Sequence, residues 1–167
     1  MRWSLVTFSF SILLALSVRA GSESLEKLNN ESVVDNDSAR FVQYMTISKN
    51  YYPENLSLAH QYADSAVTLA VKNENWIQTG LAEELQGALY KSEGDFEEAE
   101  IHLNRAVNIF FENQDYSKAA WAKKKLGDVK IERGDFTQSM NAYIEASKLA
   151  EEADDKKALA YCYRGIS

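Results

Sequence analysis

The side chains best suited to chemistry in this sequence are two histidines and one cysteine. His60 and His102 have the residue type of a general base or a metal ligand, and Cys162 has that of a nucleophile. Neither histidine has a second histidine one helical turn away that would complete a metal pair on one helix face. We therefore predict that both histidines are helix-surface residues and that Cys162 is a small packing residue.

Runs of charged residues are the next candidates for catalysis or phosphate binding. General acid–base chemistry needs carboxylates that converge in a cleft, whereas the Glu97–Glu98 and Glu151–Glu152 pairs are typical of solvated helix faces. Lys123, Lys124 and Lys125 point in different directions on a helix, which favours a solvated face over a phosphate site. The sequence contains no glycine-rich phosphate loop, metal-ligand spacing or catalytic triad motif. We expect no cofactor, no metal site and no enzyme active site, and we rank an enzyme third among the functions considered.

Composition restricts the elements that could position these side chains. A single Pro and seven Gly cannot supply the turns of an all-β domain of 167 residues. One Cys excludes a disulfide scaffold, and 46% hydrophobic residues are enough for a real core. The chain is therefore predicted to be all-α.

The N-terminal segment 1–20 has the pattern of a secretory signal peptide. A basic start at Arg2 precedes an apolar run from Leu5 to Leu16, and small residues at Val18 and Ala20 suit a cleavage site. The apolar run is shorter than the roughly 20 residues that span a bilayer, so an uncleaved anchor is the second interpretation. We predict a signal peptide at 1–20, a polar segment at 21–36 and a periplasmic or extracytoplasmic location, either free or anchored through a downstream segment.

The charge balance limits the class of partner. The formal net charge is −7, and loss of Arg2 and Arg19 with the signal peptide makes it −9. Such an acidic chain repels the phosphate backbone of nucleic acid. We expect a protein or peptide partner, no nucleic acid and no membrane insertion beyond the signal peptide.

An internal repeat is the strongest pattern in the sequence. Gly94-Asp95-Phe96 recurs as Gly134-Asp135-Phe136, which gives a period of 40, and Gly87 recurs as Gly127 at the same offset. We call a set of residues spaced by 40 a column. Four further columns keep one residue class over three copies: Ala59, Ala99 and Ser139; Ala66, Ala106 and Ala146; Leu69, Ile109 and Leu149; Asn55, Asp95 and Asp135. Agreement in several independent columns indicates a repeat architecture.

Within each repeat, apolar residues recur at helical spacing. The pattern predicts helices at 37–51, 54–72, 75–93, 95–112, 115–133, 135–152 and 155–167. Gly94 suits a left-handed residue after a helix end, and Asp95 with Glu98 suits a capping box, as Asp135 does with Gln138. A helical hairpin cannot bury its apolar face alone, so successive hairpins must stack through the small columns, with Leu56, Phe96 and Phe136 filling the space between them.

These residues resemble the tetratricopeptide repeat. The resemblance depends on Gly87, Tyr90, Gly94, Asp95, Phe96, Ala99, Leu103 and Ala106, and on a second copy formed by Leu126, Gly127, Gly134, Asp135, Phe136, Tyr143 and Ala146. The chain differs from the family in its period of 40 instead of about 34, in Lys130 at the place of Tyr90, and in the missing closing Pro. The resemblance implies an α-α superhelix with repeats at about 37–74, 75–114 and 115–153 and a truncated repeat at 154–167.

The segment from Asp37 to Ala70 also resembles the opening repeat of exported bacterial sensor proteins. In such proteins the helical array precedes a membrane helix and a histidine kinase or DNA-binding output module. A repeat array usually ends in a polar capping unit, so we expect the chain to be the N-terminal part of a longer signalling protein. The second hypothesis is a stand-alone exported adaptor in a protein assembly.

The resemblance places the partner site on the concave face lined by the first helix of each hairpin. Among the residues of the first helices that are spaced by 40, one column is apolar or aromatic. A second column, one turn further along each of these helices, is mostly charged. The candidate binding residues are Phe41, Tyr44, Leu81, Glu84, Trp121, Lys124, Asp128, Tyr161 and Arg164. Aromatic anchors beside polar groups could hold an extended peptide or a partner helix. The alternative is that the aromatic column packs between neighbouring first helices.

Overall fold

The computed structural model describes residues 36–52 and 54–166, which form seven α-helices and no strand. The helices are α2 (Asp37–Tyr51), α3 (Leu56–Lys72), α4 (Trp76–Glu93), α5 (Phe96–Glu112), α6 (Tyr116–Glu132), α7 (Phe136–Glu152) and α8 (Lys156–Ile166). The all-α prediction is confirmed for these residues, and each predicted helix boundary lies close to the observed one. The predicted signal peptide at 1–20, and the polar segment at 21–36 except Asn36, lie outside the described residues.

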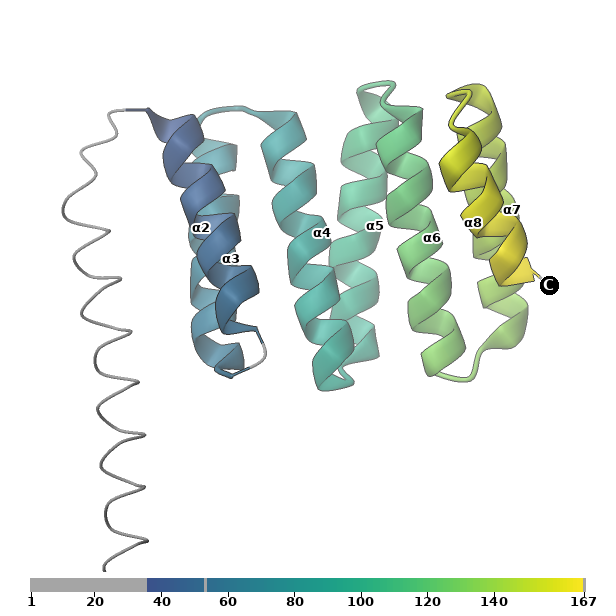
Figure 1. The fold of residues 1–167 in the computed structure, drawn as a ribbon, viewed down its shortest axis with the longest axis horizontal. Helices are drawn as coiled ribbons and strands as arrows, with labels where there is room; N and C mark the ends of the chain where they lie inside the picture. Colours follow the sequence, from purple (N-terminus) through teal and green to yellow (C-terminus); the bar gives the residue numbers. More distant parts are fainter. Residues whose placement is uncertain (1–35, 53, 167) are drawn as a thin grey trace, which may run out of the picture. The chain divides into compact units, whose positions relative to one another are not determined.

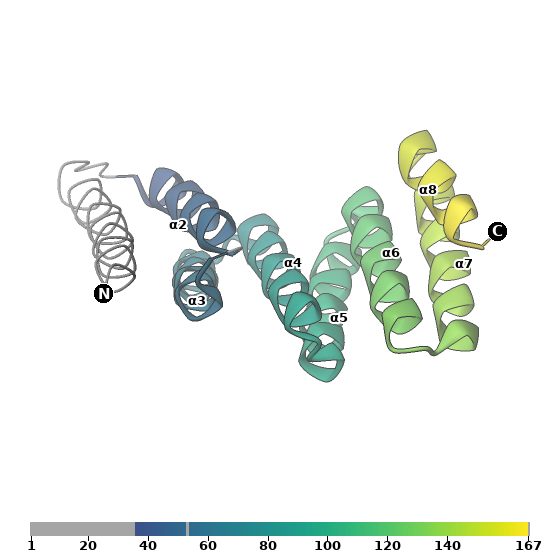
Figure 2. The same cartoon turned by 60° about the horizontal axis from the view of Figure 1, so that its bottom comes forward.

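Consecutive helices pack side by side as antiparallel neighbours. In Figure 1 the connections alternate between the two ends of the helices, with α2, α4, α6 and α8 on the near side and α3, α5 and α7 behind them. Figure 2 shows the same alternation after rotation. Each helix contacts the next along the chain, and α6 also contacts α8. This adjacent packing is consistent with a helical repeat. None of the helices in the described part of the chain has the length and apolar character needed to cross a membrane.

An Asn or Asp side chain caps the N-terminus of every helix from α3 to α8. In each case the side-chain oxygen accepts a hydrogen bond from a backbone N–H in the first helical turn, which satisfies one of the unpaired N–H groups at the helix start. The six caps are Asn55, Asn75, Asp95, Asp115, Asp135 and Asp155. The caps predicted for Asp95 and Asp135 are confirmed.

The capping boxes predicted at the two Gly-Asp turns form only in part. The Asp95 N–H donates to the carbonyl of Tyr90 at 3.0 Å, so it is not available to the Glu98 side chain. This bond closes the preceding helix around Gly94, whose φ of 81° is left-handed as predicted. Because the turn consumes the Asp95 N–H, the return bond expected from Glu98 has no donor.

Small residues allow close approach of the helices. The Ala and Ser side chains of the two small columns are all at most 1% exposed: Ala59, Ala66, Ala99, Ala106, Ser139 and Ala146. Leu56 and Phe96 are half-buried, and Phe96 packs against Leu126 and Val129 of the next hairpin, but Phe136 is 69% exposed. The prediction that Phe136 fills such a space is therefore wrong, because the described helices leave its ring uncovered.

Candidate binding surface

The predicted binding residues nearest the N-terminus belong to a core cluster. Phe41 of α2 is 4% exposed and packs with Ala66, Leu69, Ala70 and Ala82. Tyr44 and Leu81 are half-buried and pack against the same cluster. The ring of Phe41 contributes to the core in this structure and is not accessible to a partner. At this end of the chain, the predicted aromatic column therefore packs between helices, as the alternative interpretation expected.

The predicted residues nearest the C-terminus gather between α6 and α8, in what we call the Trp121–Tyr161 cluster. The ring centroids of Trp121 and Tyr161 are 5.3 Å apart, and both residues are half-buried. The guanidinium carbon of Arg164 lies 4.7 Å from the Tyr161 centroid, and Lys124 Nζ lies 5.9 Å from it. Both cations are within the range of cation–π attraction, so the structure joins four of the predicted residues in one constellation.

Asp128 anchors the charged side of this cluster. Its Oδ2 accepts from Lys124 Nζ at 2.7 Å, and its Oδ1 accepts from the Tyr143 hydroxyl at 2.7 Å. Burial and then the hydrogen bond to Asp128 raise the pKa of Tyr143 above its ordinary value. Because two donors hold the Asp128 carboxylate, the position of Lys124 beside the aromatic rings is well defined.

Asp155 holds the aromatic side of the cluster to the start of α8. The indole N–H of Trp121 donates to Asp155 Oδ2 at 3.1 Å, and the Ser117 hydroxyl donates to the same oxygen at 2.6 Å. The Ala158 N–H donates to Oδ1 at 2.9 Å, which makes Asp155 the helix cap as well. These bonds lower the pKa of the Asp155 carboxyl, the Ala158 bond first and the Ser117 bond second, against an opposing effect of burial. Trp121 therefore has a structural role in this part of the fold.

The lowered pKa of Asp155 predicts an acid-sensitive contribution to stability. Because the pKa is lower in the folded than in the unfolded chain, ionised Asp155 stabilises the fold above its ordinary pKa, and this contribution is lost as pH falls through the folded-state value. Asp155→Asn keeps a capping side chain but removes the charge. In urea unfolding, we expect the wild type to be more stable than Asp155→Asn at neutral pH, with the difference shrinking as pH falls from about 5 to about 3. A difference that stays constant with pH would contradict this role.

A shallow pocket lies between α4 and α6, next to the Trp121–Tyr161 cluster. It has a volume of ≈ 240 Å³ and is lined by Glu84, Lys118, Trp121 and Lys125. Glu84, another predicted residue, forms an ion pair with Lys125 across the helices at 2.9 Å. The predicted surface thus contains aromatic edges, mixed charge and a shallow depression.

The run of three lysines is engaged in ion pairs. As predicted, the side chains point in different directions, but each meets a carboxylate, and two of these carboxylates lie on neighbouring helices. The pairs are Lys123–Glu145 at 2.6 Å, Lys124–Asp128 at 2.7 Å and Lys125–Glu84 at 2.9 Å. The run therefore links α6 to α4 and α7, a role that the solvated-face interpretation missed.

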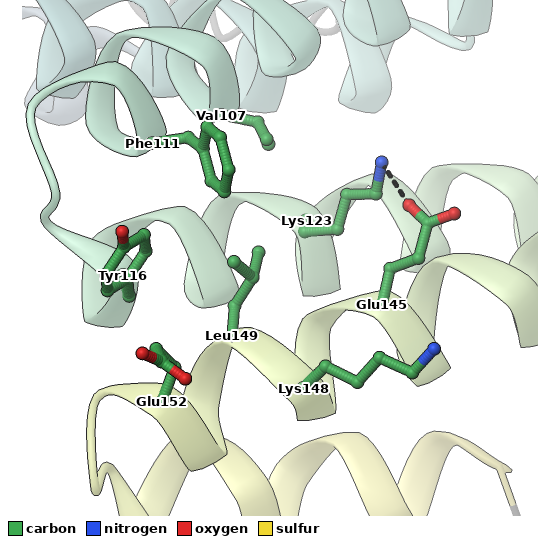
Figure 3. Close-up of a pocket in the computed structure, with 8 residues that line it drawn as sticks. All are labelled: Val107, Phe111, Tyr116, Lys123, Glu145, Lys148, Leu149 and Glu152. Carbon is green, nitrogen blue, oxygen red and sulfur yellow. Dashed lines mark ion pairs between the residues drawn. The ribbon is translucent and has the colours of Figure 1, made fainter.

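A second pocket, which sequence reasoning missed, lies over α6 between α5 and α7. Its volume is ≈ 470 Å³, and Figure 3 shows Phe111 and Leu149 directed toward it, with the Lys123–Glu145 ion pair beside them. Phe111 is 52% exposed and its ring meets that of Tyr116 edge-on at 5.7 Å. Adjacent residues of a helix cannot share one face, so the Phe110–Phe111 pair was the available signal that one aromatic ring is exposed.

The two histidines are not simple surface residues. Their side chains are only 16% and 14% exposed, and the Tyr90 ring lies between them, with centroids 4.4 Å from His60 and 5.2 Å from His102. His60 Nδ1 lies 2.8 Å from Gln86 Oε1, and His102 Nδ1 lies 2.7 Å from Glu83 Oε2. The surface prediction is corrected: both rings are part of a polar network that joins α3, α4 and α5.

The pKa values of Tyr90 and Cys162 are both raised above their ordinary values. Burial, followed by nearby carboxylates with Asp64 first, raises the pKa of Tyr90. Burial also raises the pKa of Cys162, which is 0% exposed and packs as the predicted small residue. Among residues 36–52 and 54–166, no group of three His, Cys, Asp or Glu side chains is arranged to hold a metal ion.

Comparison with known proteins adds no family assignment. No protein-family model matches the sequence. No curated protein matches it significantly either.

Proposed function

We propose that residues 37–167 are a tetratricopeptide-like module that binds a protein or peptide, and that it is the extracytoplasmic sensing or scaffolding region of a larger bacterial signalling protein. The positions of the helices support the repeat assignment. The second helices begin at Leu56, Phe96 and Phe136, and the first helices α4, α6 and α8 begin at Trp76, Tyr116 and Lys156. Within each series, successive helices begin 40 residues apart, which is the period of the sequence repeat.

The observation that carries the binding proposal is the Trp121–Tyr161 cluster. Aromatic rings with an apolar body and an accessible edge are the usual anchors of peptide interfaces. Here a Trp ring of α6 and a Tyr ring of α8 lie 5.3 Å apart, and Arg164 and Lys124 lie within cation–π distance of the Tyr161 ring. The rings can contact an apolar side chain of a peptide, while the cations can meet its carbonyl or carboxylate oxygens.

The test needs a variant that removes an anchor without loosening α8. Trp121→Ala would also remove the hydrogen bond to Asp155, so Tyr161→Ala is the better variant. Tyr163→Ala is a matched control, because Tyr163 lies on the same helix, is 51% exposed and donates its hydroxyl hydrogen to Glu151. Equal thermal melts of the two variants would establish that both are folded.

The probe is a displayed library of random dodecapeptides selected on the purified wild-type protein. We expect Tyr161→Ala to weaken binding of the selected peptides at least about ten-fold, which corresponds to roughly 1.4 kcal/mol, with no comparable effect of Tyr163→Ala. Failure to select any saturable binder, or equal binding by wild type and Tyr161→Ala, would refute the proposed surface.

A further inference from the structure

The pocket over α6, between α5 and α7, has an apolar floor that continues into the core. Its volume of ≈ 470 Å³ is within the range of ligand-binding sites. Phe111 and Leu149 are directed toward it from α5 and α7 (Figure 3). Val107, which also lines the pocket, is 8% exposed and belongs to the core cluster against which Leu149 packs. An apolar group placed in the pocket would therefore extend this core.

Two opposite charges at the rim of the pocket have no partner. Lys123 and Glu145 neutralise each other in an ion pair at 2.6 Å. Lys148 and Glu152 form neither an ion pair nor a hydrogen bond with any side chain in the part of the chain that the structure describes. In Figure 3 the Lys148 ammonium and the Glu152 carboxylate lie on opposite sides of Leu149. The pocket thus has an apolar centre between an unpaired cation and an unpaired anion.

The exposure of Phe111 is a property of its position in the repeat. The equivalent residue one repeat earlier is Val71 of α3. Val71 is 57% exposed although five further helices follow it along the chain, and Phe111 is 52% exposed. Helices that follow in the array therefore leave this position uncovered, so a separate group is needed to cover it.

The unpaired charges distinguish this pocket from the same place in the preceding repeat. There Glu83 and Arg105 pair at 3.9 Å, so an ion pair at this part of the rim occurs in both repeats, with the charges exchanged. The equivalent of Lys148 in that repeat is Asn108, which has no charge. The separated cation and anion are therefore particular to the pocket over α6, and they specify the charges of its occupant.

We propose that this pocket binds a peptide segment of a partner protein in which an aromatic residue stands between an acidic and a basic residue. The aromatic ring packs against Phe111 and Leu149 and removes their apolar surface from water. The acidic side chain pairs with Lys148, and the basic side chain pairs with Glu152.

The pocket is separate from the Trp121–Tyr161 cluster. Tyr116 and Lys123, which line the pocket, are seven residues apart and share one side of α6. Trp121 lies on the other side of this helix, because it follows Tyr116 by five residues and precedes Lys123 by two. Binding at the two places is therefore independent, and Tyr161→Ala should leave the affinity of the pocket unchanged.

Three short peptides with blocked ends provide the probe. Each has a central tryptophan, which is flanked by glutamate and lysine in the first peptide, by two lysines in the second and by two glutamates in the third. Binding to the isotope-labelled protein is measured from NMR chemical-shift changes at physiological ionic strength, which screens the overall negative charge of the chain. We expect the wild type to bind the mixed peptide at least about three-fold more tightly than the others, because only this peptide pairs with both Lys148 and Glu152.

Charge substitutions in the protein make the test specific. Lys148→Glu leaves two carboxylates at the rim and is expected to make the two-lysine peptide the tightest ligand. Glu152→Lys is expected to favour the two-glutamate peptide in the same way. Lys72→Glu is the matched control, because it changes the net charge as Lys148→Glu does but replaces an exposed lysine at the end of α3. This control should keep the wild-type order of the three peptides.

A substitution in the apolar floor tests the aromatic contact. Phe111→Ala should weaken the mixed peptide at least about five-fold, whereas Val71→Ala, at the equivalent exposed position of α3, should not. The proposal would be overturned by a lack of saturable binding, by one preferred peptide in both Lys148→Glu and Glu152→Lys, or by equal binding to Phe111→Ala and Val71→Ala. Self-association of the wild type that Phe111→Ala abolishes would also overturn it, because a second copy would then occupy the pocket.

Discussion

Phe110→Ala is expected to lower the free energy of unfolding by about 3–5 kcal/mol. Phe110 is 0% exposed and is the largest fully buried side chain among the described residues. Its ring occupies the space that Gly80 leaves open, since a Cβ on Gly80 would stand 2.5 Å from Phe110 Cε1. Phe110 also packs with Ala119 and Ala122, so its removal leaves a cavity where α4, α5 and α6 meet.

The neighbouring aromatic residue provides a matched control for this cavity. Phe111→Ala changes the same residue type one position along the same helix, but Phe111 is 52% exposed. Urea unfolding followed by circular dichroism should show a loss of less than about 1 kcal/mol for this variant, because the ring is half exposed, meets Tyr116 at the surface and leaves no buried cavity when it is removed. Similar losses for the two variants would contradict the assignment of Phe110 to the core between three helices.

Gly127→Leu is expected to destabilise the protein by about 1–3 kcal/mol through overpacking. A Cβ on Gly127 would stand 2.8 Å from Tyr143 Cε1. The Tyr143 ring cannot move away freely, because it is 3% exposed and its hydroxyl donates to Asp128. The better helix propensity of leucine offsets this cost only in part, by less than about 1 kcal/mol.

A double-mutant cycle identifies the cause of that loss. Tyr143→Ala opens a cavity beside Gly127, and the leucine of Gly127→Leu can occupy it. We expect the double variant to be more stable than the sum of the two single losses predicts, with a coupling energy of about 0.5–3 kcal/mol from urea unfolding. Strict additivity would show that the two positions do not share the same space.

Close approach at these positions explains why the repeat motif contains glycine inside a helix. Gly87 and Gly127 occupy equivalent positions of successive repeats, as do the large residues Leu103 and Tyr143 that lie against them. A Cβ on Gly87 would stand 2.6 Å from Leu103 Cγ. In these two hairpins, α4–α5 and α6–α7, the first helix provides a gap and the second helix fills it, so the glycine and the large residue act as a pair.

Helix positions were predictable because their signals are local. An Asn or Asp side chain can reach only the N–H groups of the next turn, so the caps at Asp95 and Asp135 follow from a few adjacent residues. The left-handed Gly94 and Gly134 are similarly set by the backbone of one turn. The capping box failed in part because the Asp95 N–H can close the preceding helix or bind Glu98, and the sequence does not indicate which acceptor is used.

Membership of one repeat column did not predict a shared environment. Phe41 and Tyr161 occupy equivalent positions, yet Phe41 is buried in a core cluster and Tyr161 carries Arg164 on its ring. Phe96 and Phe136 are also equivalent, but one is half-buried and the other is 69% exposed. The environment of a residue depends on the helices packed around it, which the column itself does not contain.

The amino-acid sequence was sufficient for the helices, their ends and the small columns that let them approach, because periodicity and capping act within one or two turns of the chain. The packed structure was needed to show that His60 and His102 enclose Tyr90 and that the three lysines join separate helices. Each of these features depends on residues of different helices. Such contacts are set by which face a neighbouring helix presents, and no local pattern encodes that property.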